Sequence, residues 1–315
     1  MKSLAFTLFT LVLVGNLSAQ KFVWQPSTGH TQIKIWPGVV PDAQPLMKNE
    51  FAVHPKILVA GKPWTAVVYV SQPTITVYSP SGKNTGAAVV VFPGGGYKFL
   101  DIDLGGTEIC EWLASIGITG ILLKYRVPDS GPYYNNQCKC QKDPKAPLAL
   151  EDAQRAIGLV RFHAKEWQID QHKIGVIGFS AGGYLAINVS NNFEKRLYPE
   201  VDDADKESCR PDFTLAMYPG HLLGKTTKEF ELNPDITVTN NTPPTLLLQA
   251  ENDPIDKIEN SLVYYIALIK AGVPVEYHVY AQGGHGFGLR QTKFPITGWP
   301  ELAKRWLQTI GMITK

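Results

Sequence analysis

Short apolar runs, separated by longer stretches of mixed character, recur along most of this chain. Each run is five or six residues long, and most are rich in β-branched side chains, which is typical of strands buried inside a sheet. The last run alternates apolar and polar positions, which also indicates a strand. The predicted strands cover residues 74–78, 87–92, 118–123, 173–177, 213–218, 245–250 and 275–280.

Stretches between these runs have the character of helices. Residues 147–167 repeat alanine and aliphatic side chains at helical spacing, and 104–116 and 184–189 also suit helices. A further helix is expected to begin with Asp256 as its N-cap and to run to Lys270. This alternation predicts an α/β fold with a mostly parallel central sheet and helices on both faces.

The amino terminus has the three parts of a secretory signal peptide. Met1 and Lys2 give a short basic start, an apolar stretch runs from Leu4 to Val14, and Ala19 ends a small-residue cleavage site. We therefore expect residues 1–19 to be removed and the protein to be periplasmic or extracellular, without stable membrane association. Residues 20–315 are expected to form one domain, with an N-terminal segment at 20–85 that holds the first strands and a catalytic core at 86–315.

Composition narrows the possible partners and ligands. A net charge of +2, without a cluster of lysine or arginine, argues against a nucleic-acid partner. A chain of 315 residues buries about three quarters of its unfolded surface, so its core needs neither a disulfide nor a metal. No metal site is expected, because Cys138 and Cys140 lack the second pair that zinc requires. Cys110 is expected to be buried in a helix, and a bridge from the Cys138–Cys140 pair to Cys209 remains open.

Residues Gly178 to Gly182 fit the Gly-x-Ser-x-Gly pattern and stand between a predicted strand and a predicted helix. A sharp turn from strand to helix strains the backbone of the central Ser180, and the flanking glycines let the two elements approach closely. The pattern predicts a nucleophile elbow that presents Ser180 at the carboxyl end of the sheet. A glycine-lined turn with an ordinary serine is the alternative.

A nucleophilic serine needs a base, and the base needs an orienting acid. His285 lies in a glycine-rich loop directly after the last predicted strand, from which it can reach the elbow. Asp253 follows the strand at 245–250 and precedes a proline, which holds it in the loop. Glu251 is its main competitor, and Asp256 is expected to cap the next helix. The order Ser180, Asp253, His285 is the one that α/β-hydrolases use.

Three successive glycines, Gly94 to Gly96, follow the strand at 87–92. Main-chain N–H groups in such a loop approach a substrate oxygen without side-chain obstruction, and each donor contributes about 3 kcal/mol to transition-state stabilisation. We expect an oxyanion hole formed by the N–H groups of Gly95, Gly96 and Ala181.

Two polar segments are expected to form the walls of the substrate pocket. Residues 129–145 and 219–241 both leave the sheet towards its carboxyl edge, where ligands bind in open α/β folds. Tyr97, Tyr133 and Tyr134 are the candidate substrate-binding residues. Asp152 and Arg155, on the helix at 147–167, are expected to form ion pairs at the surface or with a loop.

Together these motifs resemble the α/β-hydrolases of the esterase and lipase type. The chain is similar, more narrowly, to the secreted bacterial acetyl xylan esterases and their relatives called BD-FAE-like feruloyl or acetyl esterases. The resemblance runs from about residue 33 to the end and implies serine carboxylester hydrolysis without a cofactor, with an acylated plant oligosaccharide or polysaccharide as substrate. The residues that carry it are 35–41, 74–78, 93–97, 124–128, 178–182, 210–213 and 284–287.

Two other functional classes remain open. A serine exopeptidase or oligopeptidase shares this fold and this order of residues, but such enzymes usually carry a further large domain, and residues 20–85 are too few for a propeller. The other alternative is a binding protein with a silent hydrolase fold. The natural ester, whether acetyl on xylose, acetyl on another sugar or feruloyl, and the oligomeric state stay open.

Overall fold

A computed structural model describes residues 20–44, 48–128, 133–135, 140–142, 145–224 and 230–314. Its centre is a sheet in which five consecutive pairings, from β7 to β13, are parallel, whereas β4 pairs antiparallel with both of its neighbours. In spatial order the strands are β1 (Ile33–Lys34), β4 (Thr74–Tyr78), β7 (Thr119–Lys124), β5 (Ala88–Phe92), β10 (Ile174–Phe179), β11 (Thr214–Met217), β12 (Thr245–Ala250) and β13 (Val275–Tyr280).

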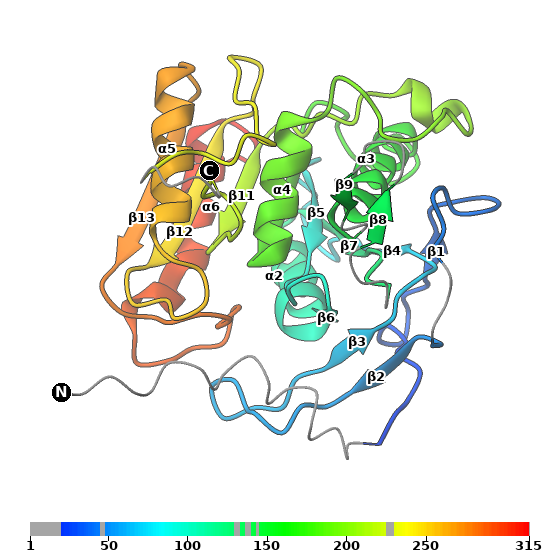
Figure 1. Cartoon of the computed structure of the whole chain (residues 1–315), viewed down its shortest axis with the longest axis horizontal. Helices are drawn as coiled ribbons and strands as arrows, with labels where there is room; N and C mark the ends of the chain where they lie inside the picture. Colours follow the sequence, from blue (N-terminus) through cyan, green and yellow to red (C-terminus); the bar gives the residue numbers. More distant parts are fainter. Residues whose placement is uncertain are drawn as a thin grey trace.

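Helices cover both faces of this sheet (Figure 1). The rings of Trp112 in α2 and Trp299 in α6 meet at 5.2 Å, so these two helices share one face. Helices α3 and α4 pack together, and Asn191 of α4 donates a hydrogen bond to Tyr264 of α5, so these three share the other face. The helices are α2 (Glu108–Ser115), α3 (Lys145–Phe162), α4 (Ala181–Asn191), α5 (Glu259–Lys270) and α6 (Trp299–Thr309), with short turns η1 (Asp103–Thr107), η2 (Asp203–Lys206) and η3 (Pro295–Gly298). This arrangement confirms the predicted α/β class with a mostly parallel sheet.

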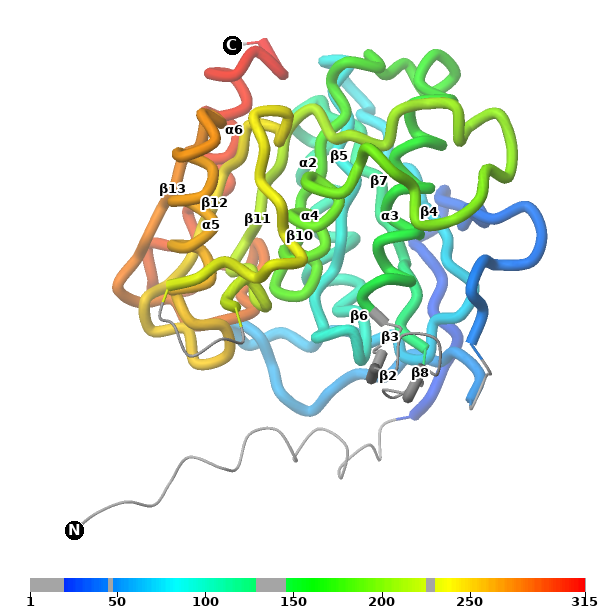
Figure 2. Tube along the Cα trace, turned by 45° about the horizontal axis from the view of Figure 1, so that its top comes forward, coloured from blue at the N-terminus to red at the C-terminus, as the bar shows by residue number. Residues whose placement is uncertain are grey.

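A second, three-stranded sheet was not predicted from the sequence. It joins β2 (Phe51–Val53) and β3 (Ala66–Val68) of the N-terminal segment to β6 (Phe99–Asp101), and all of its pairings are antiparallel. Figure 2 shows these strands beside one end of the main sheet. A third sheet is the hairpin of β8 (Tyr133–Asn135) and β9 (Cys140–Lys142). Because β6 directly follows the glycine loop, the N-terminal strands support the chain that leaves this loop.

Three helix predictions need correction. The helix predicted at 104–116 begins as the π-helical turn η1, and the helix predicted at 147–167 ends at Phe162. Asp256 is not an N-cap, because α5 starts at Glu259 with Ile258 in the capping position. The cause lies in Asp253, whose Oδ1 accepts the amide protons of Ile255 and Asp256 and so holds these residues in a turn.

Of the two kinds of ion pair predicted for α3, the structure shows pairs with loops: Asp152 pairs with Arg126 after β7, and Arg155 pairs with Asp202 before η2. Asp152 and Arg155 are buried rather than at the surface, because the N-terminal segment covers this face of the helix. Trp36 donates to Asp152 at 2.9 Å, and Arg155 donates to the carbonyl of Ile35 at 2.9 Å. Cys110 and Cys209 are both buried with free thiols. Among the described residues, no helix is long and apolar enough to cross a membrane.

Candidate active site

Ser180 lies at the point where β10 passes into α4, at the carboxyl end of the central sheet. Its backbone has φ 55° and ψ −118°, a strained conformation for a residue with a side chain. The amide of Ser180 donates to the carbonyl of Met217 at 3.0 Å, which helps to hold the turn. A Cβ on Gly178 would lie 1.9 Å from the carbonyl oxygen of Gly182, so only glycine fits there. The local structure is the strand–turn–helix geometry of a nucleophile elbow.

His285 and Asp253 meet Ser180 in a chain of hydrogen bonds. Ser180 Oγ lies 2.9 Å from Nε2 of His285, and Nδ1 of His285 lies 2.7 Å from Oδ2 of Asp253. The Asp253 carboxylate is fully covered, while 15% of the His285 side chain is exposed. With the proton of Nδ1 donated to Asp253, Nε2 accepts the hydroxyl proton of Ser180. The three residues that the sequence singled out therefore share one site.

Asn252 ties together the two loops that carry the base and the acid. Its Oδ1 accepts the amide protons of both Gly283 and Gly284 at 3.0 Å, directly before His285. The ring of Tyr218 packs edge-on against the imidazole of His285, with ring centres 4.8 Å apart. Glu251, the competing acid, is exposed and has no recorded contact with His285 among the described residues.

The glycine loop lies against the nucleophile. A Cβ built on Gly94 would lie 3.4 Å from Cβ of Ser180. Hydrogen bonds fix the loop from behind, because Tyr125 donates its hydroxyl proton to the carbonyl of Pro93 at 2.7 Å. Gly95 and Gly96 have φ values of +129° and +62°, which favour glycine.

The three amides expected to form the oxyanion hole belong to this loop and to the first turn of α4. In the described part of the chain, no acceptor is recorded for the N–H groups of Gly95, Gly96 and Ala181. Free backbone donors beside a strained serine are the arrangement that stabilises a developing oxyanion.

One wall of the site is aromatic. The Tyr97 ring lies 6.1 to 6.5 Å from the rings of Tyr125, Tyr184 and His221. The Tyr97 hydroxyl is buried and has no hydrogen-bond partner in the described structure. Tyr97 thus lies among three aromatic rings directly after the glycine loop, and its role in substrate binding stays a prediction. The side chains of Tyr133 and Tyr134 lie outside what the structure describes.

Sequence reasoning missed Tyr184 and His221. His221 belongs to the polar segment at 219–241 that was expected to line the pocket, so its place in the chain was a usable signal. Tyr184 lies inside the helix that follows the elbow, one turn beyond Ser180, and helical spacing pointed to it as well.

Two carboxyl groups at the site were also missed or misassigned. Asp256 places Oδ2 3.4 Å from Ser180 Oγ and 3.9 Å from Nε2 of His285, and burial raises the pKa of its carboxyl. Asp101 lies behind the glycine loop, where its amide donates to the carbonyl of Gly94 at 3.1 Å. Burial raises the pKa of Asp101 to about 8, and its Oδ1 has no partner among the described residues.

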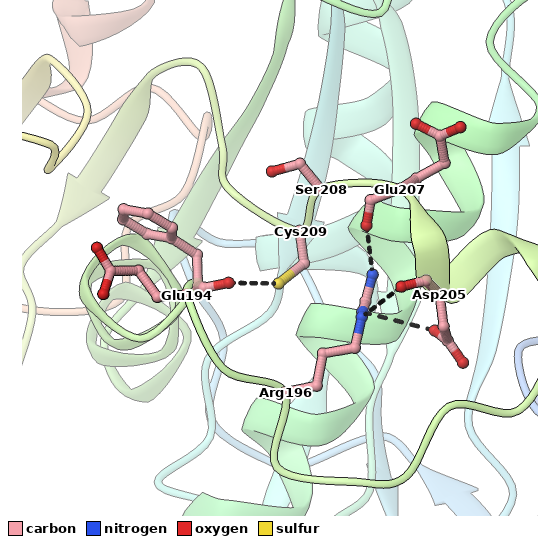
Figure 3. Close-up of a pocket in the computed structure, with 7 residues that line it drawn as sticks. Glu194, Arg196, Asp205, Glu207, Ser208 and Cys209 are labelled. Carbon is pink, nitrogen blue, oxygen red and sulfur yellow. Dashed lines mark hydrogen bonds and ion pairs between the residues drawn. The ribbon is translucent and has the colours of Figure 1, made fainter.

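A separate surface hollow lies away from the site, beside η2 (Figure 3). The guanidinium of Arg196, which lines this hollow, donates to the carbonyls of Asp205 and Glu207 at 3.2 and 2.7 Å. The thiol of Cys209 donates to the carbonyl of Phe193 at 3.3 Å. Because these groups already pair with the protein, the hollow is a structural feature. Within the described residues, no group of three or more His, Cys, Asp or Glu side chains is arranged to hold a metal ion.

A serine at the elbow, with acid and base on the loops after β12 and β13, defines the class of α/β-hydrolases. Residues 143–289 match a model of the alpha/beta hydrolase fold. The crystal structure of an acetyl ester-xyloside bifunctional hydrolase from Caldicellulosiruptor lactoaceticus is 30% identical with a TM-score of 0.68, over 90% of this chain and 97% of that one. The chain belongs to the α/β-hydrolase family.

Two further relatives are similar in sequence over about two thirds of this chain. An acetylxylan esterase from Xylanibacter ruminicola is 29% identical over 224 residues, which are 67% of this chain and 42% of the relative. The endo-1,4-beta-xylanase B of Butyrivibrio fibrisolvens is 29% identical over 231 residues, 67% of this chain and 34% of the relative. This chain therefore spans less than half the length of these two relatives.

Proposed function

We propose that this protein is a secreted serine carboxylesterase that removes short acyl groups, above all acetyl, from xylan or other plant oligosaccharides. The observation that carries the proposal is the continuous hydrogen-bonded chain from Ser180 Oγ through His285 to Asp253. This geometry makes a serine nucleophilic at neutral pH and needs no cofactor for ester hydrolysis.

The reaction follows from the positions of these atoms. Ser180 Oγ attacks the ester carbonyl while its proton passes to Nε2 of His285, and Asp253 stabilises the resulting imidazolium. The carbonyl oxygen becomes an oxyanion that accepts hydrogen bonds from the free N–H groups of the glycine loop and Ala181. His285 then gives its proton to the departing alcohol oxygen. Water, deprotonated by the same histidine, hydrolyses the acyl-enzyme and restores Ser180.

Two lines of support favour an acetylated carbohydrate. The relatives include an acetylxylan esterase, a xylanase and an acetyl ester-xyloside hydrolase. The segments expected to border the site, 129–145 and 219–241, are polar in sequence and give no continuous apolar surface for a long acyl chain. Secretion rests on the signal-peptide pattern of residues 1–19, which lie outside the described residues.

An acyl-chain series tests the proposal. The kcat/KM for p-nitrophenyl esters should fall steeply from acetate through butyrate to octanoate. The polar segments offer no apolar surface on which an added methylene could gain about 0.8 kcal/mol of binding free energy. The enzyme should also release acetate from acetylated xylo-oligosaccharides. Faster cleavage of octanoate would indicate a lipase instead. Preference for a feruloyl ester or for an aminoacyl-p-nitroanilide would indicate a feruloyl esterase or a peptidase.

A further inference from the structure

Asp256 is a carboxyl group at the nucleophile that the catalytic relay does not use. Asp253 occupies the Nδ1 side of His285, whereas Asp256 approaches the opposite, Nε2 side, where Ser180 Oγ also lies. Its Oδ2 is 3.4 Å from Ser180 Oγ and 3.9 Å from Nε2. Because Asp253 already orients the imidazole, the position of Asp256 calls for another role.

The structure holds Asp256 in a fixed position. Its amide donates to Oδ1 of Asp253 at 3.0 Å, and its carbonyl accepts from Nε2 of Gln249 at 2.6 Å. Oδ1 of Asp256 lies so close to Gly220 that a Cβ there would approach to 2.2 Å. Ser261 in turn donates to the amide oxygen of Gln249. Anchored at both backbone groups and packed against a glycine, the carboxyl is aimed at the reacting atoms.

Its neighbours leave this carboxyl free to bind a ligand. Among the described residues, the one side-chain hydroxyl within hydrogen-bond distance is that of Ser180, at 3.4 Å, and its single proton is donated to His285 in the relay. The Asp256 side chain is 17% exposed, and its Oδ2 is the atom nearest to Ser180 Oγ and to Nε2 of His285. A carboxyl group with spare acceptor capacity in a largely buried place is completed by a ligand that donates.

The reaction determines which part of the substrate lies beside Asp256. His285 Nε2 must deliver its proton to the oxygen of the departing alcohol, so this oxygen lies within hydrogen-bond reach of Nε2. Oδ2 of Asp256 is 3.9 Å from the same nitrogen. A group on the carbon next to the esterified one therefore comes within reach of Asp256.

We propose that Asp256 is a specificity-determining residue for the alcohol part of the ester, and that its carboxyl group binds a hydroxyl on the carbon next to the esterified carbon. The inference rests on the proposed function, since it takes ester hydrolysis by Ser180 as given. It makes the alcohol side selective for polyols and sugars with a free neighbouring hydroxyl.

A hydroxyl suits this position better than a cationic group. Burial raises the pKa of Asp256, which makes the ionised form more costly and so weakens the attraction of an ammonium group. A hydroxyl donates to a carboxylate and accepts from a protonated carboxyl, so it pairs with either form.

Two pairs of acetates, each differing in one feature, test the proposal. The first pair is trans-2-hydroxycyclohexyl acetate and cyclohexyl acetate, and the readout is the ratio of their kcat/KM values. The second pair is acetylcholine and its neutral tert-butyl analogue. The enzymes are the wild type, Asp256→Ala, Asp256→Asn and, as matched control, Glu251→Gln, which alters an exposed carboxylate of the same loop. Circular dichroism and Tm check that each variant is folded.

The wild type should favour the hydroxy ester by about 10- to 100-fold, the range of one hydrogen bond to a charged group. In Asp256→Ala the ratio should fall close to the ratio of the hydrolysis rates of the two esters in the absence of enzyme. In Asp256→Asn, whose amide still pairs with a hydroxyl, the ratio should be intermediate. In Glu251→Gln it should remain unchanged. Equal ratios in the wild type and both Asp256 variants overturn the inference while the esterase proposal stands. A preference for acetylcholine that disappears in Asp256→Ala overturns it in favour of a cation site. Failure of the wild type to cleave any of these acetates overturns both.

Discussion

Two groups of buried charges in this molecule differ in how completely they are paired. Along α3, Arg126 donates to Asp152 at 3.0 Å and to Glu151 at 2.8 Å. Arg155 lies 3.0 Å from the buried Asp205 and also donates to the exposed Asp202 at 2.7 Å. Each charge in this group has an opposite charge beside it. These pairs connect α3 to the chain after β7 and to the turn before η2.

At the carboxyl edge of the sheet the pairing is incomplete. Oδ1 of Asp101 and the hydroxyl of Tyr97 are buried without a partner in the described structure. Asp256 has one long hydrogen bond, to Ser180. The backbone is strained there too, since Ser180, Tyr97 and Tyr218 all have positive φ values, between 40° and 56°.

The difference separates structural charges from functional ones. A buried charge with a full set of partners fixes the packing of helices, and removing one partner leaves the other desolvated. A buried polar group without partners is costly, and proteins retain such groups mainly where a ligand or a reaction uses them. The following changes test this contrast, from the largest expected effect to the smallest.

Ser180→Ala should abolish activity and leave the fold intact. The side chain lies at an accessible turn, so its loss removes the nucleophile without disturbing the core. By analogy with serine protease triads, turnover should fall by about 10⁶. Initial rates on p-nitrophenyl acetate measure the effect, and an unchanged far-UV spectrum and Tm serve as the control. Activity near that of the wild type would remove Ser180 from the mechanism.

Asp253→Asn should lower turnover by about 10⁴, because an amide cannot orient the Nδ1–H tautomer of His285 in the same way. Glu251→Gln is the matched control and should cost little, since its side chain is exposed. Both variants are assayed on the same acetate at equal concentrations of folded protein. If the ranking were reversed, Glu251 would be the acid of the relay.

On the paired side, Asp152→Asn should act on stability instead of chemistry. Loss of the charge opposite Arg126 should lower the free energy of unfolding by about 3 kcal/mol, at the lower end for breaking a buried pair because Glu151 remains. Urea denaturation measures this change. Lys206→Ala, which removes one member of an exposed pair with Asp203, is the control and should leave the midpoint unchanged. A large loss of turnover in Asp152→Asn without a loss of stability would contradict the contrast.

The sequence predicted the layout of this fold better than its details. The strands at 74–78, 245–250 and 275–280 have the predicted bounds. Runs of apolar residues indicate strands that are buried on both faces of the sheet, which is why a parallel sheet can be predicted from sequence. Helix starts depend on which side chain accepts which amide, and Asp256 was misassigned because Asp253 takes that amide first.

The site divides along the same line. Ser180, Asp253 and His285 each follow a strand, and parallel strands bring their carboxyl ends to one edge, so motif order alone predicts that they meet. Asp101 and His221 come to the site through contacts distant in sequence. Asp101 is placed by the pairing of β6 with the N-terminal strand β3. The hydrophobic periodicity of the sequence did not predict the sheet that these strands form. Such placements depend on tertiary packing, which a single sequence does not display.

The last change, Asp101→Asn, should have an effect that depends on pH. The pKa of Asp101 is about 8 in the folded protein, raised by burial, against about 3.9 for an unperturbed aspartate. Between these values the folded state holds a proton that the unfolded state has released, so this group lowers the stability of the protein as pH rises from about 4 to about 8. The amide of Asn carries no charge at any pH and lacks this dependence.

Tm should therefore fall more steeply in the wild type than in Asp101→Asn over that interval, so that the variant gains relative stability towards pH 8. Thermal unfolding at closely spaced pH values measures the difference, with Glu251→Gln as an exposed carboxylate control that should follow the wild type. Parallel curves for the wild type and Asp101→Asn would mean that Asp101 is ionised in the folded state and has a partner. If Asp101→Asn starts with the lower Tm near pH 4 and its curve then meets or crosses that of the wild type towards pH 8, the Asp101 carboxyl group behind the glycine loop carries a proton at neutral pH.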